Sequence, residues 1–267
     1  MKEILSNITK DYLYRLIKEG KRIDGRDMNE YRDIQIDPDW TSSAEGSARV
    51  RLGDTDVIVG IKMEVGEPFP DTPDKGVLTT SAELIPMASP EYESGPPGED
   101  ATELARVVDR GIRESGAVDT TELCIEEGEK AWVIFIDIHV LDFDGNLFDA
   151  AGIGAMTALL DADVPASNFD EAEEDEDYPL PIEHIVVPNT FTKIKDEIIL
   201  DAQLEEEKIA DARLTVTFNE EDEIVAMQKG LRGVFKYDDT MDCIERSKEL
   251  SETMRERIMD EIDRENI

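Results

Sequence analysis

Cysteine and histidine are scarce, since the 267 residues contain only two of each. Cys124 and Cys243 cannot build a disulfide framework or a cysteine-based metal set, so we expect each to act as a small buried apolar side chain in a reducing compartment. His139 and His184 both stand in apolar, strand-like surroundings. A histidine general base, or a zinc site built from these two residues, is therefore not expected.

Long apolar runs are also missing. No stretch of about eighteen apolar residues occurs, as a membrane-spanning helix would require. The first residues, MKEILSNITKDYLYRL, mix charged and apolar side chains and do not resemble a signal peptide. The chain has no GxSxG, no P-loop and no GxGxxG leading into a helix. These absences predict a soluble, cytoplasmic protein that makes no membrane contact.

Positive charge is scarce relative to negative charge. The chain has 28 lysines and arginines against 65 aspartates and glutamates, which gives a net charge of −37 and a pI near 4.2. A field of this sign repels nucleic acid and acidic membranes at long range. It also suggests, as a hypothesis, a salt-rich cytoplasm in which screening offsets self-repulsion. Stability or assembly that survived transfer to low salt unchanged would contradict that hypothesis.

Strands followed by helices occur twice along the chain, a pattern typical of an α+β protein with two similarly built lobes. A first helix is predicted at residues 2–19, with Ile4, Leu5, Ile8, Tyr12 and Leu16 as its apolar stripe. Strands are predicted at 47–51, 56–65, 77–85, 122–126 and 131–142. The last of these is apolar on both faces, as a central strand would be. Helices are predicted at 101–115 and 148–160, and the second is so rich in small residues that it must pack closely.

The second half begins after an acidic loop at 169–179. Short strands are predicted at 185–187, 191–194, 197–201, 212–218 and 223–228. A long helix at 239–264 is expected to close the chain, with Met241, Ile244, Met254, Ile258 and Ile262 as its apolar stripe.

The helix at 101–115 is the most informative segment. Arg106, Arg110 and Arg113 follow the spacing i, i+4, i+7 and share one side, opposite Leu104 and Val108. In so acidic a chain, the arginine column is either a solvated face with intrahelical acidic partners or a track for anions, because guanidinium groups bind phosphates bidentately.

Three acidic segments could hold cations or perform acid–base chemistry. Residues 141–149 superficially resemble a calcium loop, but their spacing does not fit an EF-hand, and Asp144-Gly145 is a favoured turn pair. Residues 170–177 could bind cations weakly, or they could simply form a solvent-exposed surface loop. Residues 200–214 place Glu205 and Asp211 after a strand. These two carboxylates could bind a metal or act as acid and base, or the segment could simply be an acidic connecting turn.

Several segments, taken in order, resemble the RNase PH superfamily, and most closely the non-catalytic RNase-PH-type subunit of the archaeal RNA exosome. They are RIDGR (22–26), EYRDI (30–34), EGSARVRLGDTDVIVGIK (45–62), PDTPDKG (70–76), ELARVVDRGIRES (103–115), DFDGN (142–146), KIADARLTVTF (208–218) and MQKG (227–230). The resemblance covers nearly the whole chain. It implies an α+β RNase PH fold of two ribosomal-S5-domain-2-like lobes: an N-terminal helix (1–21), domain 1 (22–165), an acidic linker loop (166–181) and domain 2 with the C-terminal helix (182–267).

Departures from the catalytic members of that family imply a subunit that is not itself an enzyme. Where catalytic members carry two adjacent arginines, this chain has Glu99 and Asp100, and their GTR phosphate-binding turn is replaced by Gly145-Asn146-Leu147. Of the two catalytic aspartates, Asp211 matches the second while Glu205 stands at the first. Phosphorolysis of RNA needs fixed positive charge to gather phosphate. The resemblance therefore implies no catalytic residues, no metal and no cofactor in this chain.

The same resemblance assigns RNA-backbone contacts to Arg106 and Arg110, with Arg113 on the same face. It implies a catalytic RNase-PH-type partner in a hexameric ring of three heterodimers, RNA-binding cap subunits, and single-stranded RNA in the ring. Two alternatives stay open: an active phosphate-dependent 3′-to-5′ exoribonuclease that uses Glu205 and Asp211, and an acidic cation-binding protein that uses residues 170–177.

Overall fold

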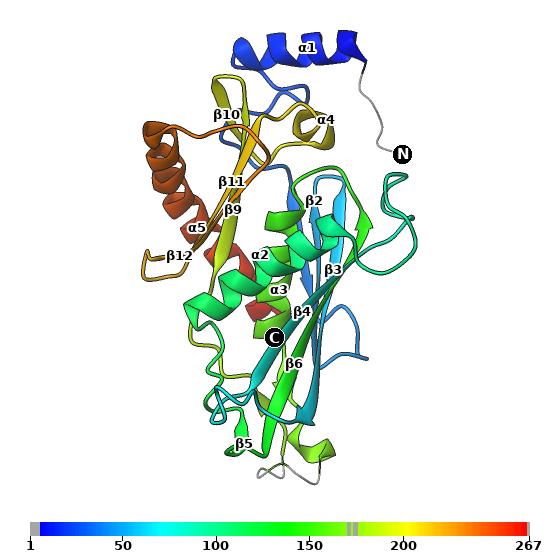
Figure 1. Cartoon of the computed structure of the whole chain (residues 1–267), viewed down its shortest axis with the longest axis vertical. Helices are drawn as coiled ribbons and strands as arrows, with labels where there is room; N and C mark the ends of the chain where they lie inside the picture. The colour runs from blue at the N-terminus through cyan, green and yellow to red at the C-terminus, as the bar shows by residue number, and fades with distance from the viewer. Residues whose placement is uncertain (1–5, 170–171, 173–175, 266–267) are drawn as a thin grey trace.

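The computed structural model describes residues 6–169, 172 and 176–265. Figure 1 shows an elongated molecule with a large sheet at one end and a small sheet toward the other. The fold is α+β, as predicted. No helix in the described ranges is both long enough and apolar enough to cross a bilayer.

The large sheet has the order β1-β2-β3-β6-β4, with β5 paired to β6. All its pairs are antiparallel except that of β4 with β6. Its strands are β1 (Ile34–Pro38), β2 (Gly46–Leu52), β3 (Thr55–Gly66), β4 (Val77–Leu84), β5 (Cys124–Glu126) and β6 (Lys130–Asp142). β6 occupies a central position, as predicted, but only one of its faces is buried: Ile134, Ile136 and Ile138 are fully buried, whereas His139 is exposed.

The small sheet is antiparallel, with the order β10-β9-β11-β12. Its strands are β9 (Val187–Ile194), β10 (Glu197–Leu200), β11 (Ala212–Phe218) and β12 (Ile224–Gly230). The sequence predicted two strands where β9 is continuous, because Pro188 lacks the N–H of an ordinary strand residue. Proline is tolerated here because β10 pairs only with Phe191–Ile194, so Pro188 lies beyond the paired stretch on that side.

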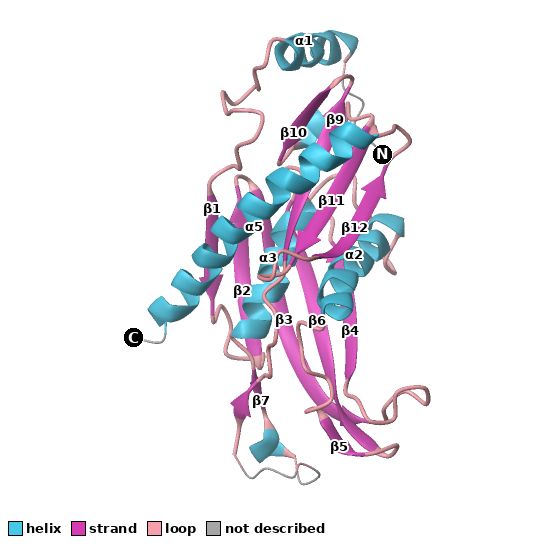
Figure 2. Ribbon diagram, turned by 90° about the vertical axis from the view of Figure 1, so that its left-hand side faces the viewer, coloured by secondary structure: helices cyan, strands magenta, loops and turns pink. Residues whose placement is uncertain are grey.

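Two helices lie between the sheets (Figure 2), namely α2 (Glu99–Ser115), which packs on β4 and β12, and α3 (Leu147–Leu160), which packs on β2, β3 and β9. α3 is buried on all sides, which confirms the expectation of close packing. A Cβ atom on Gly152 would lie 2.4 Å from Pro188 Cγ, and one on Gly154 would lie 3.0 Å from Val59 Cγ2. The small residues therefore let the two sheets approach the same helix.

The remaining helices cover the small sheet. α5 (Tyr237–Glu265) packs on β9 and β11 and reaches β1, while α4 (Leu204–Glu207) is a single turn. In the middle of α5 the buried line is Cys243, Ser247 and Ser251, which the predicted apolar stripe omits, although Met254 and Ile258 are buried as expected. A small ribbon pairs β7 (Asp163–Val164) with β8 (Tyr178–Pro179) around the 3-10 turn Ala166–Asn168.

The first helix, α1 (Asn7–Lys18), lies across the end of the small sheet (Figure 1). Its predicted stripe is wrong at Ile8, which is 83% exposed, and at Tyr12, which is 49% exposed, whereas Leu16 is half-buried. The helix instead buries Leu13 and Ile17 in a cluster with apolar residues of the small sheet. Ile4 and Leu5 fall outside the described residues. Apolar spacing alone could not decide which of two adjacent faces meets the sheet.

Candidate functional site

α2 carries the arginine column on the side that faces away from the core. Leu104, Val108 and Ile112 are buried, and the helix ends at Gly116, whose φ of 67° suits the left-handed cap. Glu99 and Asp100 occupy the first turn, where carboxylates interact favourably with the helix dipole. The same two residues place negative charge at the positions where, by the resemblance described above, catalytic family members carry two adjacent arginines.

Arg106 and Arg110 line one open groove of about 620 Å³ between α2 and β12. Arg106 is exposed and forms no hydrogen bond or ion pair with any residue that the structure describes. Arg110 is half-buried, and its Nη1 donates to Oε1 of Gln228 at 2.9 Å. The groove thus presents one unpaired guanidinium and one that is held by a neutral partner. Glu99 and Glu103 also line this groove.

Arg113 is not among the residues that line this groove. Its guanidinium donates to both carboxylate oxygens of Asp109, at 3.1 and 2.8 Å, and to the carbonyl oxygen of Leu78 at 2.8 Å. The hydrogen bonds to Asp109 raise the pKa of Arg113 above its usual value. Arg113 therefore links α2 to β4. Of the three arginines in the column, the structure places only Arg106 and Arg110 in the same groove.

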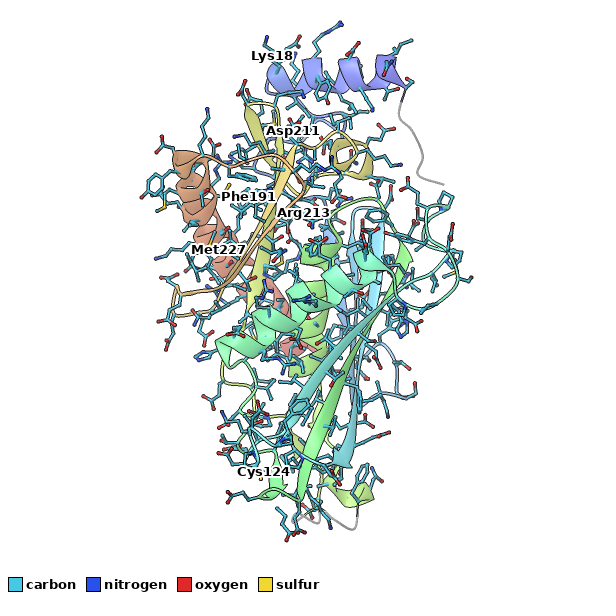
Figure 3. The ribbon with its side chains drawn as sticks, viewed as in Figure 1. Lys18, Cys124, Phe191, Asp211, Arg213 and Met227 are labelled. Carbon is cyan, nitrogen blue, oxygen red and sulfur yellow. The ribbon has the colours of Figure 1, made fainter. Side chains whose placement is uncertain are left out.

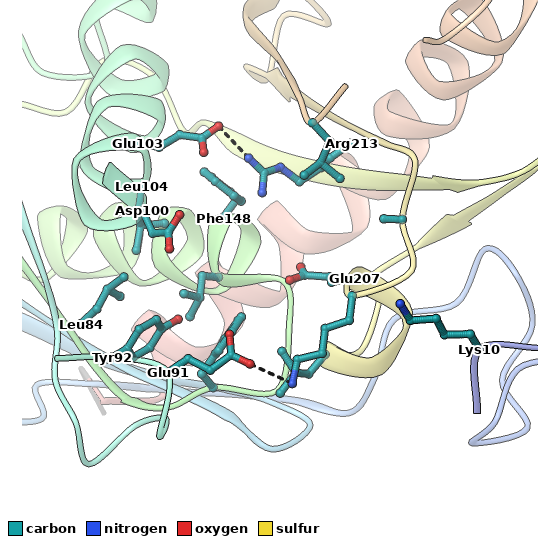
Figure 4. A pocket seen from close by; sticks show the side chains of 16 residues that line it. Lys10, Leu84, Glu91, Tyr92, Asp100, Glu103, Leu104, Phe148, Glu207 and Arg213 are labelled. Atoms are coloured by element: carbon teal, nitrogen blue, oxygen red, sulfur yellow. Dashed lines mark hydrogen bonds and ion pairs between the residues drawn. The ribbon is translucent and has the colours of Figure 1, made fainter. Parts of the chain in front are cut away.

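A second cavity, of about 470 Å³, opens between α2, α3 and α4 (Figure 4). Its lining includes Lys10, Lys208 and Arg213, and the carboxylates Glu91, Asp100, Glu103 and Glu207. Lys208 Nζ lies 3.1 Å from Glu91 Oε1, and Arg213 Nη2 lies 2.7 Å from Glu103 Oε1. The Arg213 guanidinium also stacks 4.0 Å from the centre of the Phe148 ring. Acidic groups outnumber basic ones here, and two of the three cations are already paired.

The first turn of α3 borders this cavity. Gly145 and Asn146 both have positive φ, 88° and 53°, and a Cβ on Gly145 would lie 2.4 Å from the carbonyl oxygen of Ala202. A helix N-terminus with free amides commonly binds an anion. Here the backbone N–H of Asn146 donates to Glu207 Oε1 at 2.7 Å. Burial raises the pKa of Glu207, although the hydrogen bond from Asn146 and the charge of Arg213 act in the opposite direction.

The structure does not bring Glu205 and Asp211 into the cavity. Glu205 is exposed on α4. Asp211 accepts a hydrogen bond from the backbone N–H of Lys195 at 2.7 Å, and its other oxygen lies 3.5 Å from Lys195 Nζ. Asp211 thus closes the turn between β9 and β10.

Sequence reasoning missed a buried ionic cluster beside α4. Arg22, Arg26 and Arg32 converge on Asp201 and Glu206, which stand in the acidic segment where a solvated turn was one of the alternatives. Burial acts to raise the pKa of Asp201, but the hydrogen bonds and charge of Arg32 outweigh it, so this pKa lies below its ordinary value. The sequence signal for this cluster was the set of three arginines in RIDGR and EYRDI, in a chain that has few basic residues.

Other acidic and histidine candidates hold no site in the described residues. No group of three or more metal-binding side chains gathers there. His139 lies 3.4 Å from Glu83, and His184 lies 2.8 Å from Glu220, whose hydrogen bond raises the pKa of that histidine. Most of the acidic run at 170–177 lies outside the described residues, namely 170, 171 and 173–175.

Two family domains match the chain. Residues 30–165 match the 3′ exoribonuclease family, domain 1 (RNase PH), and residues 184–249 match domain 2 of the same family. Among similar proteins, the exosome complex component Rrp42 of Thermococcus kodakarensis is 51% identical over 98% of each chain. The exosome complex component Rrp42 of Methanocella arvoryzae is 48% identical, covering 96% of this chain and 97% of that one.

Solved structures show the same likeness. A chain of the Archaeoglobus fulgidus exosome with RNA bound to the active site superposes with a TM-score of 0.90 at 46% identity, over 94% of this chain and 98% of that chain. A chain of an archaeal exosome core superposes with a TM-score of 0.87 at 43% identity, over 95% and 97% of the two chains.

Proposed function

This chain belongs to the 3′ exoribonuclease (RNase PH) family, and from that premise we propose that it is the non-catalytic, RNA-holding subunit of an archaeal-type exosome ring. In this proposal it alternates with a catalytic homologue in a cytoplasmic hexamer of three heterodimers, to which RNA-binding cap subunits attach. The homologue carries out 3′-to-5′ phosphorolysis and tailing. The proposed units are domain 1 at 22–165 and domain 2 at 182–267, joined by the loop at 166–181 and preceded by the N-terminal helix at 1–21.

One observation carries the non-catalytic part of the proposal: the Glu207 carboxylate accepts the Asn146 N–H at the start of α3. A phosphorolytic site must hold inorganic phosphate with fixed donors and cations. In this cavity the helix-terminal donor already has an internal anion, and Arg213 is paired with Glu103. A phosphate entering it would meet net negative charge at short range, where Coulomb repulsion is largest.

The RNA-holding part rests on the groove between α2 and β12. Arg106 and Arg110 line it together, and Arg106 has no partner in the described part of the chain. Guanidinium contacts to phosphates position an RNA strand without selecting its sequence. We propose Arg106 and Arg110 as the RNA contacts of this subunit. Arg113 remains a weaker candidate, because Asp109 and Leu78 already use its donors.

The active-exonuclease alternative finds less support. It needs Glu205 and Asp211 at one reacting centre, yet Glu205 is exposed on α4 and Asp211 is engaged with Lys195. The cation-binding alternative needs residues 170–177, of which 170, 171 and 173–175 lie outside the described residues.

Purified alone and given polyadenylate with orthophosphate, the chain should release no ADP. Phosphate-dependent ADP release that disappears in Asp211→Asn would establish the active-exonuclease alternative instead.

Mixed with its catalytic homologue, the chain should support degradation, and the double variant Arg106→Glu, Arg110→Glu should weaken RNA binding while the ring still assembles. Each lost phosphate contact to a single strand lowers the slope of log affinity against log salt by about 0.7. Arg51→Glu, on β2 of the large sheet and outside the groove, is the matched charge-reversal control for each of the single variants Arg106→Glu and Arg110→Glu.

A further inference from the structure

The function proposed above assigns no ligand to the cavity of about 470 Å³ between α2, α3 and α4. Much of its wall is apolar or aromatic, and this part includes Leu84, Leu104, Phe143, Leu147, Phe148 and Leu204. Charged side chains make up most of the rest. A concave, mostly apolar surface of this size with a few charged groups is typical of a small-molecule site.

The walls of the cavity are held in place by two ion pairs. Arg213 of β11 lies between the small sheet and α2 (Figure 3), where its Nη2 is 2.7 Å from Glu103 Oε1 and its guanidinium stacks on the Phe148 ring. Lys208, at the end of α4, lies 3.1 Å from Glu91 on the loop that follows β4. Because these contacts join separate elements, the cavity is formed before any ligand arrives, and binding orders few side chains.

Two carboxylates of the cavity lack a cationic partner. Asp100 is exposed in the first turn of α2 and makes no hydrogen bond or ion pair with a described residue. Glu207 accepts the Asn146 N–H through Oε1, but within the described ranges its Oε2 has no partner. Lys10 lies across the cavity from Asp100 and Tyr92 in Figure 4. The part of the cavity around Tyr92 therefore has a net negative charge.

Tyr92 is the aromatic side chain that these carboxylates surround. Burial, followed by the negative charges of Glu207, Asp100 and Glu91, raises the pKa of the Tyr92 phenol above its ordinary value. Its ring also stacks with that of Phe143, at 5.6 Å between ring centres. An ammonium group is attracted both by the face of an aromatic ring and by a carboxylate. This part of the cavity thus suits an organic cation.

The lining also distinguishes between classes of cation. A metal ion would need convergent ligands, but no group of three or more metal-binding side chains gathers within the described part of the chain. A ligand with an apolar body matches the apolar wall, and two unmatched carboxylates call for two positive charges. We propose that the cavity binds an aliphatic diamine, whose ammonium groups pair with Glu207 and Asp100 and whose methylene chain lies along Tyr92. This site goes beyond the proposed function and does not depend on it.

The test titrates the full chain with cadaverine in a calorimeter, at about 0.1 M salt, where long-range attraction is largely screened. One saturable site is expected, with a dissociation constant below about 1 mM, since two charge-assisted contacts form at once. Pentylamine has the same carbon chain but one ammonium group, so it should bind at least about fivefold more weakly. Mg²⁺ at the same ionic strength should not displace the diamine.

Charge-removing variants locate the site. Glu207→Gln keeps an acceptor for the Asn146 N–H and should weaken cadaverine binding at least about tenfold. Asp100→Asn should weaken it about two- to fivefold, because that carboxylate is exposed. The matched controls are Glu205→Gln on α4 and Glu99→Gln in the same turn as Asp100, neither of which lines the cavity. Unchanged thermal unfolding confirms that each variant folds.

Saturable binding that Glu207→Gln and Asp100→Asn weaken, and that both controls retain, supports the inference. Heats that do not saturate, or equal losses in variants and controls, would reveal diffuse attraction of amines to a chain of net charge −37 and would overturn it. Pentylamine binding as tight as that of cadaverine would also overturn it, because one ammonium group would then suffice. The unmixed chain is used without RNA or its homologue, so a negative result leaves the function proposed above untouched.

Discussion

Arg32 and Asp201 face each other in the interior, with Arg32 Nη2 2.8 Å from Asp201 Oδ1 and Arg32 Nε 2.9 Å from Asp201 Oδ2. The same guanidinium donates to the carbonyl oxygens of Asp144 and Gly145, at 2.7 and 3.2 Å. One bidentate pair therefore links the segment before β1, the end of β10 and the turn that begins α3. The cavity between α2, α3 and α4 borders the turn that begins α3. The shape of this cavity therefore depends on the Arg32–Asp201 pair, although neither residue lines it.

Removing one partner of this pair should be strongly destabilising. Asp201→Ala leaves Arg32 and Arg26 without their buried carboxylate, and breaking a buried ion pair in this way costs about 3–5 kcal/mol. The free energy of unfolding in urea measures it. Arg51→Ala is the control, because its pair with Asp37 is about 40% exposed on both sides, and such pairs contribute about 1 kcal/mol or less. Equal losses in the two variants would contradict this role for Asp201.

Two buried carboxylates should give the stability curve opposite slopes at acid pH. Asp201 has a lowered pKa in the folded chain, so its contribution is complete above the unfolded value of about 3.9 and is lost as pH falls through the folded value. Burial raises the pKa of Asp149 to about 6, although Thr190, Asn146 and Tyr31 donate hydrogen bonds to it. Between about pH 4 and 6 the folded chain holds a proton on Asp149 that the unfolded chain has lost, so this contribution falls as pH rises.

Asp149→Asn isolates the second effect. The free energy of unfolding of the unmodified chain, minus that of the variant, should decrease by about 2 kcal/mol between about pH 4.5 and pH 7, because the raised pKa of Asp149 lies about one and a half pH units above the lower limit. Urea titrations at several pH values supply the difference. A difference that grows with pH would show that the hydrogen bonds to Asp149 outweigh its burial and would contradict the expectation.

The anion position at the start of α3 should become available when its internal occupant is removed. Glu207→Ala frees the Asn146 N–H and removes a carboxylate from the cavity. The variant should therefore bind orthophosphate weakly, at millimolar concentration, as helix N-termini do when no competing anion is present. Titration with phosphate, followed by the amide NMR shifts of Asn146 and Leu147, detects the binding. Glu205→Ala on the exposed side of the same short helix is the control, and equal shifts in the two variants would contradict the assignment.

The sequence could predict strands and the larger helices because burial imposes alternation or a helical repeat on apolar residues. It could not separate Asp201 and Glu206 from Glu205, since all three stand in one acidic segment and only the tertiary fold decides which of them meets an arginine. The same limit applies to the arginine column. Helical spacing placed Arg106, Arg110 and Arg113 on one side, with Asp109 one turn before Arg113, but the other partner of Arg113, the carbonyl oxygen of Leu78, lies in β4, which helical spacing does not reveal.

Gln228 should set the direction of the Arg110 side chain. Its Oε1 accepts from Arg110 Nη1 at 2.9 Å across the groove between α2 and β12, and both residues line that groove. Gln228→Glu keeps the shape but turns the contact into an ion pair, which should engage the guanidinium and place a negative charge beside the proposed RNA path. In the assembled ring, RNA affinity should fall, and the slope of log affinity against log salt should decrease by up to about 0.7, one phosphate contact.

The conservative change Gln228→Met removes the hydrogen bond without adding charge, so it should lower RNA affinity less and leave the salt slope nearly unchanged. A purely structural role for Gln228 would give the reverse pattern: both variants would lower the free energy of unfolding, and neither would alter the slope. Gln35→Glu adds the same charge at an exposed position of β1, outside the groove, and controls for the general effect of one more carboxylate. If Gln35→Glu reduced RNA affinity as much as Gln228→Glu, the long-range field of the chain would explain the loss, and Gln228 would have no positioning role.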